Sequence, residues 1–140
     1  MSEEQAQQLL QQMQMLENHF AQLTQQENSI ISIVREANSA IHSINETKVK
    51  TESENLVPIG MGVYIKSKIQ SKDKVIINIG SGVAIEKDHN SATNWLESRL
   101  KELEIALQNV SSQRKQVAEN LELGKQQMQN LIQKSQKPQK

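Results

Sequence analysis

Histidine, serine and carboxylate side chains are the groups in this 140-residue chain that could support catalysis or bind a metal ion. His19 and His42 fall in helical stretches and His89 falls in a loop, and no metal-ligand spacing relates the three. The chain contains no Cys, no Ser lies in a nucleophile-elbow sequence, and the carboxylates lie on solvated helix faces without an enclosing pocket. We therefore expect no catalytic residues and no metal site, and a protein that is not an enzyme.

A Gly-x-Gly sequence, which could form a phosphate-binding loop, occurs in Ile59–Ile65 and again in the similar stretch Ile79–Ile85. A dinucleotide-binding fingerprint needs a third Gly three residues further on and a helix that opens there. In this chain an Ile, the last residue of each stretch, occupies that position, and strand-forming residues surround it. The glycines instead suit positive φ or a bulge at the bend of a β-hairpin, and we expect no cofactor.

Two heptad runs of equal length, Leu9–Ile44 and Leu96–Leu131, enclose these hairpin sequences. The first run is Leu9, Met13, Leu16, Phe20, Leu23, Glu27, Ile30, Val34, Ala37, Ile41 and Ile44. The second run is Leu96, Leu100, Leu103, Leu107, Val110, Arg114, Val117, Leu121, Gly124, Met128 and Leu131. A stripe that repeats every seven residues over five heptads predicts a coiled coil, because a 3.5-residue period keeps one stripe facing a partner helix. We call the residues of these two runs the seam.

An antiparallel pair within the chain is favoured, because the segment between the runs is short enough to turn the chain round. At about 1.5 Å per residue, each run makes an arm on the order of 50 Å long. Folding back places the two charged exceptions, Glu27 and Arg114, within half a heptad of each other. Such a polar layer can fix the coiled-coil register, although both residues can also be solvated seam-edge residues.

The segment from Thr47 to Lys87 predicts two consecutive β-hairpins, because β-branched residues alternate along it. Four short strands with exposed edges cannot bury enough surface alone, so we expect assembly with other subunits by strand pairing into a shared sheet or barrel. A closed sheet packed on the helix bases is the alternative. The expected assembly residues are Val57, Ile59, Val63, Ile65, Val75, Ile77, Ile79, Val83 and Ile85.

The predicted organisation is an N-terminal coiled-coil helix over residues 1–46, the hairpins over 47–87, a C-terminal coiled-coil helix over 88–134 and a disordered tail over 135–140. Asp88 or Asn90 is expected to cap the second helix. The fold class is therefore α+β: a long antiparallel coiled-coil hairpin with two β-hairpins at its base, whose strands contribute to an oligomeric β-barrel.

Bulk properties exclude several partners. The formal net charge is zero and no basic patch is interleaved with aromatic residues, so we expect no nucleic-acid binding. No apolar stretch approaches the length of a membrane span, no signal pattern opens the chain and no Cys is present. We expect a soluble protein in the cytoplasm with no membrane association.

Methionine and off-seam apolar residues gather where the two chain ends meet. Met suits a surface that must fit many shapes, since its side chain is flexible and polarizable. Gly124 inside the second helix is expected to leave a gap opposite Leu16 and to loosen this end. The alternative is that these residues only complete the seam. The candidate binding residues are Leu9, Leu10, Met13, Met15, Leu16, Met128, Leu131 and Ile132.

The order helix, two hairpins and helix resembles the alpha-type subunit of prefoldin. The resemblance covers nearly the whole chain and rests on the motifs Leu56–Gly62, Gly80–Glu86 and Trp95–Leu100. Beta-type subunits have a single hairpin, so the pair of hairpins is informative. The resemblance implies a hexamer of two alpha and four beta subunits, with a double β-barrel body and six coiled-coil arms. It also implies that unfolded clients are held at apolar tips and passed to a group II chaperonin without nucleotide.

The expected function is therefore that of an ATP-independent chaperone subunit, with prefoldin beta subunits, unfolded clients and a group II chaperonin as partners. Multivalent weak capture by several arms would raise the effective concentration of binding tips. A structural or tethering coiled coil that oligomerises through its β segment but holds no clients is the main alternative. A periplasmic holding chaperone of similar outline is a weaker alternative, because no signal peptide is apparent.

Overall fold

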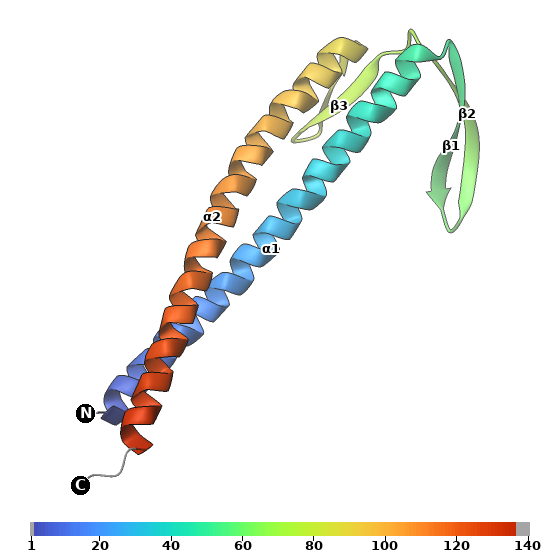
Figure 1. The fold of residues 1–140 in the computed structure, drawn as a ribbon. Coiled ribbons are helices and arrows are strands. Elements are labelled where there is room, and N and C mark those ends of the chain that lie inside the picture. Colours follow the sequence, from blue (N-terminus) through green and yellow to red (C-terminus); the bar gives the residue numbers. More distant parts are fainter. Residues whose placement is uncertain (1, 137–140) are drawn as a thin grey trace. The chain divides into compact units, whose positions relative to one another are not determined.

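A computed structural model describes residues 2–136. Along the chain, these residues form one helix, four strands and a second helix (Figure 1). Helix α1 spans Ser2–Val49 and helix α2 spans His89–Gln136. His89, expected in a loop, is thus the first residue of α2. Of the tail predicted to be disordered, residues 137–140 lie outside the described residues.

The chain divides into two compact units, each containing part of both helices. The terminal unit is Met1–Ser32 with Glu104–Lys140, and the hairpin unit is Ile33–Leu103. In the terminal unit the helices are antiparallel: Met13 lies next to Gly124, whereas Glu27, later in α1, lies next to Arg114, earlier in α2. In the hairpin unit, Lys48 Nζ donates a hydrogen bond of 2.6 Å to Asn90 Oδ1, which joins the end of α1 to the start of α2.

The predicted coiled-coil seam is confirmed along both helices. Every residue of the two heptad runs is buried or half-buried, including the charged exceptions Glu27 and Arg114. Leu23 and Val117 in the terminal unit are only 3% and 7% exposed. The expected gap opposite Leu16 is wrong, however, because Met13 packs against Gly124.

The start of α2 is fixed by a side-chain cap, as predicted for Asp88. The Ser91 N–H donates a hydrogen bond of 2.7 Å to Asp88 Oδ1. This bond lowers the pKa of the Asp88 carboxyl from its usual range, because it favours the charged form. Ala92, one residue further on, is completely buried and donates the first helical backbone bond to Asp88 O.

The four strands form two separate antiparallel hairpins. Strand β1 (Glu52–Gly60) pairs with β2 (Val63–Gln70), and β3 (Val75–Gly80) pairs with β4 (Val83–Lys87). Among the described residues the hairpins thus remain two two-stranded sheets, and a closed sheet within the chain is not formed.

Both hairpins turn with the same two-residue loop, as their sequence repeat suggests. Met61 and Gly62 have φ of 50° and 79°, and the equivalent Ser81 and Gly82 have 55° and 75°. Positive φ at both central residues is the feature of a type I′ turn, whose twist matches that of the strands. The register shifts just before each loop, and in the second hairpin Asn78 Oδ1 accepts a hydrogen bond of 2.9 Å from the Gly80 N–H at that point.

Candidate functional sites

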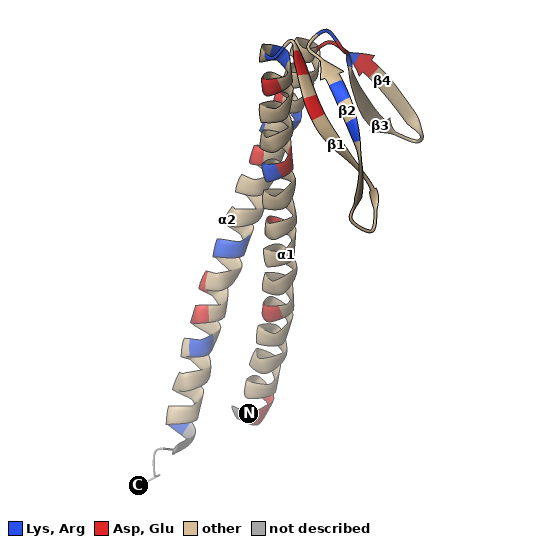
Figure 2. Ribbon diagram, turned by 90° about the vertical axis from the view of Figure 1, so that its right-hand side faces the viewer, with Lys and Arg blue, Asp and Glu red and all other residues tan. Residues whose placement is uncertain are grey.

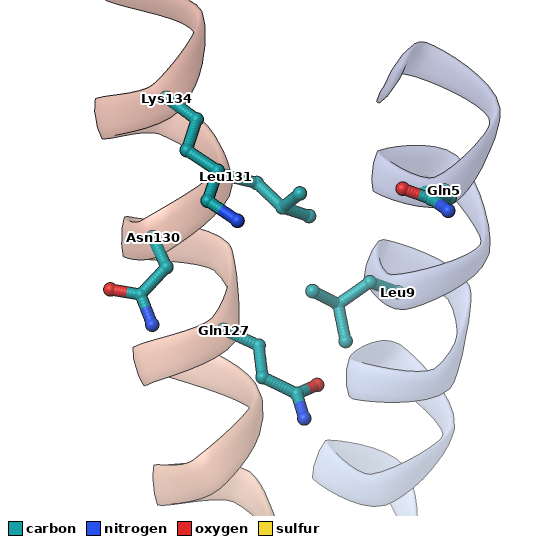
Figure 3. Close-up of a pocket in the computed structure, with 6 residues that line it drawn as sticks. All are labelled: Gln5, Leu9, Gln127, Asn130, Leu131 and Lys134. Atoms are coloured by element: carbon teal, nitrogen blue, oxygen red, sulfur yellow. The ribbon is translucent and has the colours of Figure 1, made fainter. Parts of the chain in front are cut away.

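A shallow pocket lies between the two helices at the ends of the terminal unit (Figure 3). Its volume is about 310 Å³. In Figure 3 the Leu9 side chain of α1 and the Leu131 side chain of α2 point toward each other across the gap. The remaining lining is polar and comes from both helices: Gln5, Gln127, Asn130 and Lys134. The pocket therefore offers a small apolar surface with amide groups and one cation beside it.

The predicted binding residues of this region fall into two sets. Leu9, Met13, Leu16, Met128 and Leu131 are half-buried seam residues. Leu10, Met15 and Ile132 lie off the seam and are 50%, 72% and 47% exposed. The second set is not needed to cover the seam, so it remains accessible to a partner.

A polar layer interrupts the seam in the terminal unit, and the structure brings its two predicted members together. Arg114 Nε lies 3.2 Å from Glu27 Oε2 without an aligned hydrogen bond, so the attraction is chiefly between the two charges. The Ser111 hydroxyl donates a hydrogen bond of 2.9 Å to Glu27 Oε2, and the Arg114 guanidinium lies 5.8 Å from the centre of the Phe20 ring. Sequence reasoning missed Ser111, which precedes Arg114 by nearly one turn.

The β-hairpins carry the second candidate surface. Most of the predicted assembly residues are uncovered in this chain, with exposed fractions between 46% and 60%: Val57, Ile59, Val63, Ile65, Ile79 and Val83. Val75 and Ile85 are half-buried, and Ile77 is 8% exposed. Ile77 is thus already covered within the chain and Val75 and Ile85 are partly covered, whereas the six exposed residues are available to another subunit.

Sequence reasoning missed the opposite face of the hairpins. Leu56, Tyr64 and Ile76 are 61%, 56% and 67% exposed, and they alternate with the residues predicted for assembly. Near-continuous apolar runs such as Leu56–Gly60 are the pattern of strands covered on both faces, and this signal was available. The first hairpin therefore needs cover on both of its faces.

Charge is distributed unevenly along the hairpins and between the helices (Figure 2). In the first hairpin the charged residues, coloured in Figure 2, lie in the half that is far from the loop. In that half Lys68 Nζ is 3.9 Å from Glu52 Oε1, whereas the loop half is uncharged. In the terminal unit the described part of α1 carries only acidic charges, whereas that of α2 carries all the described Lys and Arg of this unit together with three Glu. The uncharged loop halves are thus the parts of the hairpins that are best suited to burial.

The described residues contain no group of three or more His, Cys, Asp or Glu side chains that could hold a metal ion. Across the same part of the chain, neither helix is both long and apolar enough to cross a membrane.

Comparisons with known proteins agree with this arrangement of helices and hairpins. The sequence model of the family described as "Prefoldin subunit" matches residues 9–137. The prefoldin subunit alpha of Nitrosopumilus maritimus is 52% identical over 133 residues, which are 95% of this chain and 92% of that protein.

Two solved structures share the fold at low sequence identity. The prefoldin beta subunit of Thermococcus strain KS-1 has a TM-score of 0.69 at 19% identity, over 96% of this chain and 95% of that one. The filamentous PFD of Methanocaldococcus jannaschii has a TM-score of 0.66 at 15% identity, over 83% of this chain and 94% of that one.

The family match and the similarity to a prefoldin subunit alpha identify a coiled-coil subunit of a non-enzymatic chaperone family. The chain belongs to the prefoldin family, as an alpha-type subunit. The expectation of a non-enzymatic protein is thereby confirmed.

Proposed function

We propose that this chain captures unfolded polypeptides at the ends of its paired helices, as one subunit of a cytoplasmic prefoldin hexamer. The observation that carries this proposal is the set of exposed off-seam residues Leu10, Met15 and Ile132, together with the shallow pocket between Leu9 and Leu131. These side chains add apolar surface that the seam does not use, and burial of apolar surface is the main attraction for an unfolded segment.

Weak binding of a client at the end of one helix pair is sufficient for stable capture if several helix pairs act together. The pocket is small, so a single helix pair holds only a short apolar segment. Several arms on one body raise the effective concentration of free tips around a bound client, which increases the overall affinity without new contacts. In this proposal the client is then passed to a group II chaperonin, and no nucleotide takes part.

The β-hairpins are the proposed assembly surface. Exposed Val57, Val63 and Ile65 on one face and Leu56 and Tyr64 on the other support strand pairing and packing with other subunits. We propose that the strands join a double β-barrel body containing two alpha and four prefoldin beta subunits. The proximity of Glu27 and Arg114 supports their proposed role in fixing the register of the arm.

The composition of the assembly is tested by native mass spectrometry of the complex captured from the native host. A hexamer with two copies of this chain and four of a smaller helical partner is expected. A homodimer or an open polymer would favour the rival function, a scaffold or tether that holds no clients.

Client capture is tested by replacing Leu10, Met15 and Ile132 together with Ser in the full complex. Because these residues lie outside the seam, the hexamer should persist while suppression of client aggregation falls severalfold. Ile105 and Leu123 provide a matched control, since they are 62% and 57% exposed on α2 but are not among the candidate binding residues. Replacing both controls with Ser should leave client holding at the wild-type level. Equal holding by the triple variant and the control variant would refute capture at the tips.

A further inference from the structure

Met13 packs against a part of α2 that has no side chain. Gly124 is buried, and a Cβ atom built on it would lie 3.2 Å from Met13 Cγ and 3.5 Å from Met13 Sδ. The thioether therefore fills the space that a side chain on α2 would otherwise occupy. Met13 itself is only half-buried, so one side of its side chain remains open to small solutes.

Methionine sulfur reacts with peroxides by a two-electron oxidation. The sulfur lone pair attacks one peroxide oxygen, an S–O bond forms, the O–O bond breaks and the second oxygen leaves as water. The product, methionine sulfoxide, is polar and larger than the thioether, and it requires hydrogen-bond partners. Methionine sulfoxide reductases can reverse the change.

The contact with Gly124 does not accommodate this product. At Met13 an oxygen added on the side that faces Gly124 must push α2 away, and an oxygen added on the open side draws the polar sulfoxide toward water and out of the seam. Both outcomes remove one seam layer near the end of the helix pair, where Leu9 and Leu131 line the pocket between the helices.

We propose that Met13 is a reversible oxidation site that opens the terminal helix pair. Met15 serves as an internal reference: it is 72% exposed and lies off the seam, so oxidation there changes the surface but leaves the packing intact. Opening exposes seam leucines such as Leu9 and Leu16, so oxidant stress enlarges the apolar surface at the arm end. An increase in client holding is the expected consequence, and this step alone rests on the proposed function.

The test is hydrogen exchange followed by mass spectrometry on the assembled full-length protein, before and after hydrogen peroxide, with peptide mapping of each sulfoxide. In the wild type, amide exchange around residues 9–16 and 121–131 should rise on the order of tenfold after oxidation. Met13→Leu should abolish the rise, because Leu fills a similar volume and cannot be oxidised. Met15→Leu should respond like the wild type.

A second variant tests the contact without oxidant. Gly124→Val places a branched side chain against Met13 Cγ, where the Cβ atom alone would already lie at 3.2 Å, so it should raise exchange at the same amides in the reduced protein. An unchanged rise in Met13→Leu, a rise abolished by Met128→Leu instead, or no sulfoxide at Met13 when Met15 is fully oxidised would each overturn the proposal. Client holding is measured separately: if the reduced wild type holds no client, the proposed function fails, while the exchange data still decide the role of Met13.

Discussion

The seam of the terminal unit and the β-hairpins are both apolar, but the seam is buried within the chain, whereas most apolar residues of the hairpins are exposed. Leu23 and Val117 on the seam are 3% and 7% exposed, because the other helix of the same chain lies against them. Val57 and Ile65 on the first hairpin are 46% and 55% exposed. The same chain thus contains one region that completes its own packing and one region that depends on another molecule.

This difference follows from geometry more than from composition. Each helix presents a single apolar stripe, and one partner helix is enough to cover it. A two-stranded sheet has two faces and two open edges, and a hairpin alone is marginally stable in water. The first hairpin is apolar on both faces, so no single helix could cover it. Membership in a family of multi-subunit chaperones agrees with this incompleteness.

The largest expected effect comes from a charge on the uncovered region. Val57→Asp should abolish assembly while far-ultraviolet circular dichroism retains the helical signal. A buried, unpaired carboxylate costs roughly 3–5 kcal/mol, which weakens association by at least a factor of about 100. Native mass spectrometry and light scattering measure the loss. Leu123→Asp is the control, because Leu123 is similarly exposed at 57% but lies outside the hairpins. Normal hexamers with Val57→Asp would show that the hairpins are not the assembly surface.

A smaller effect is expected where the seam contains charge. Glu27 is 14% exposed in its side chain and Arg114 is 39% exposed, so Arg114 can still reach water when Glu27 is removed. Glu27→Leu alone should therefore lower the stability by roughly 1 kcal/mol, measured by thermal unfolding. Glu27→Leu combined with Arg114→Leu should restore or raise the unfolding temperature, because two apolar residues pack without desolvation of charge.

The double variant also tests the register. Spin labels at exposed Gln22 and Gln113 should give one narrow distance distribution in the wild type. The distribution should broaden in the double variant, since a uniform apolar seam permits slipped alignments. A narrow distribution in the double variant would show that the other seam residues fix the alignment, and that the polar layer has no register role.

The helices could be predicted from the sequence to a greater extent than the contacts between them. The seven-residue period is a local property, and all its positions are covered as expected. The Met13–Gly124 contact and the bond from Ser111 to Glu27 depend on the axial offset of the helices, which the period leaves free. Ala92, completely buried, was missed because a small residue gives a weak apolar signal. For the hairpins, alternation identified one face but did not show what covers it.

The smallest expected effect lies at Asp88, the residue between β4 and α2 that joins the two regions. Its folded-state pKa is lowered, chiefly by the hydrogen bond from the Ser91 N–H, so folding favours the charged carboxylate. The resulting stabilisation is present above the ordinary pKa and is lost as the pH falls through the lowered one.

Asp88→Asn keeps a cap acceptor without the charge. The unfolding temperature of the wild type should thus exceed that of the variant slightly at pH 6, and the difference should be smaller at pH 3, below the ordinary pKa of about 4. Asp88→Ala, which lacks any cap, should be less stable than Asp88→Asn at both pH values. A difference between wild type and Asp88→Asn that is constant with pH would show that charge at this junction contributes nothing, and that only the geometry of the cap joins the self-sufficient helices to the dependent hairpins.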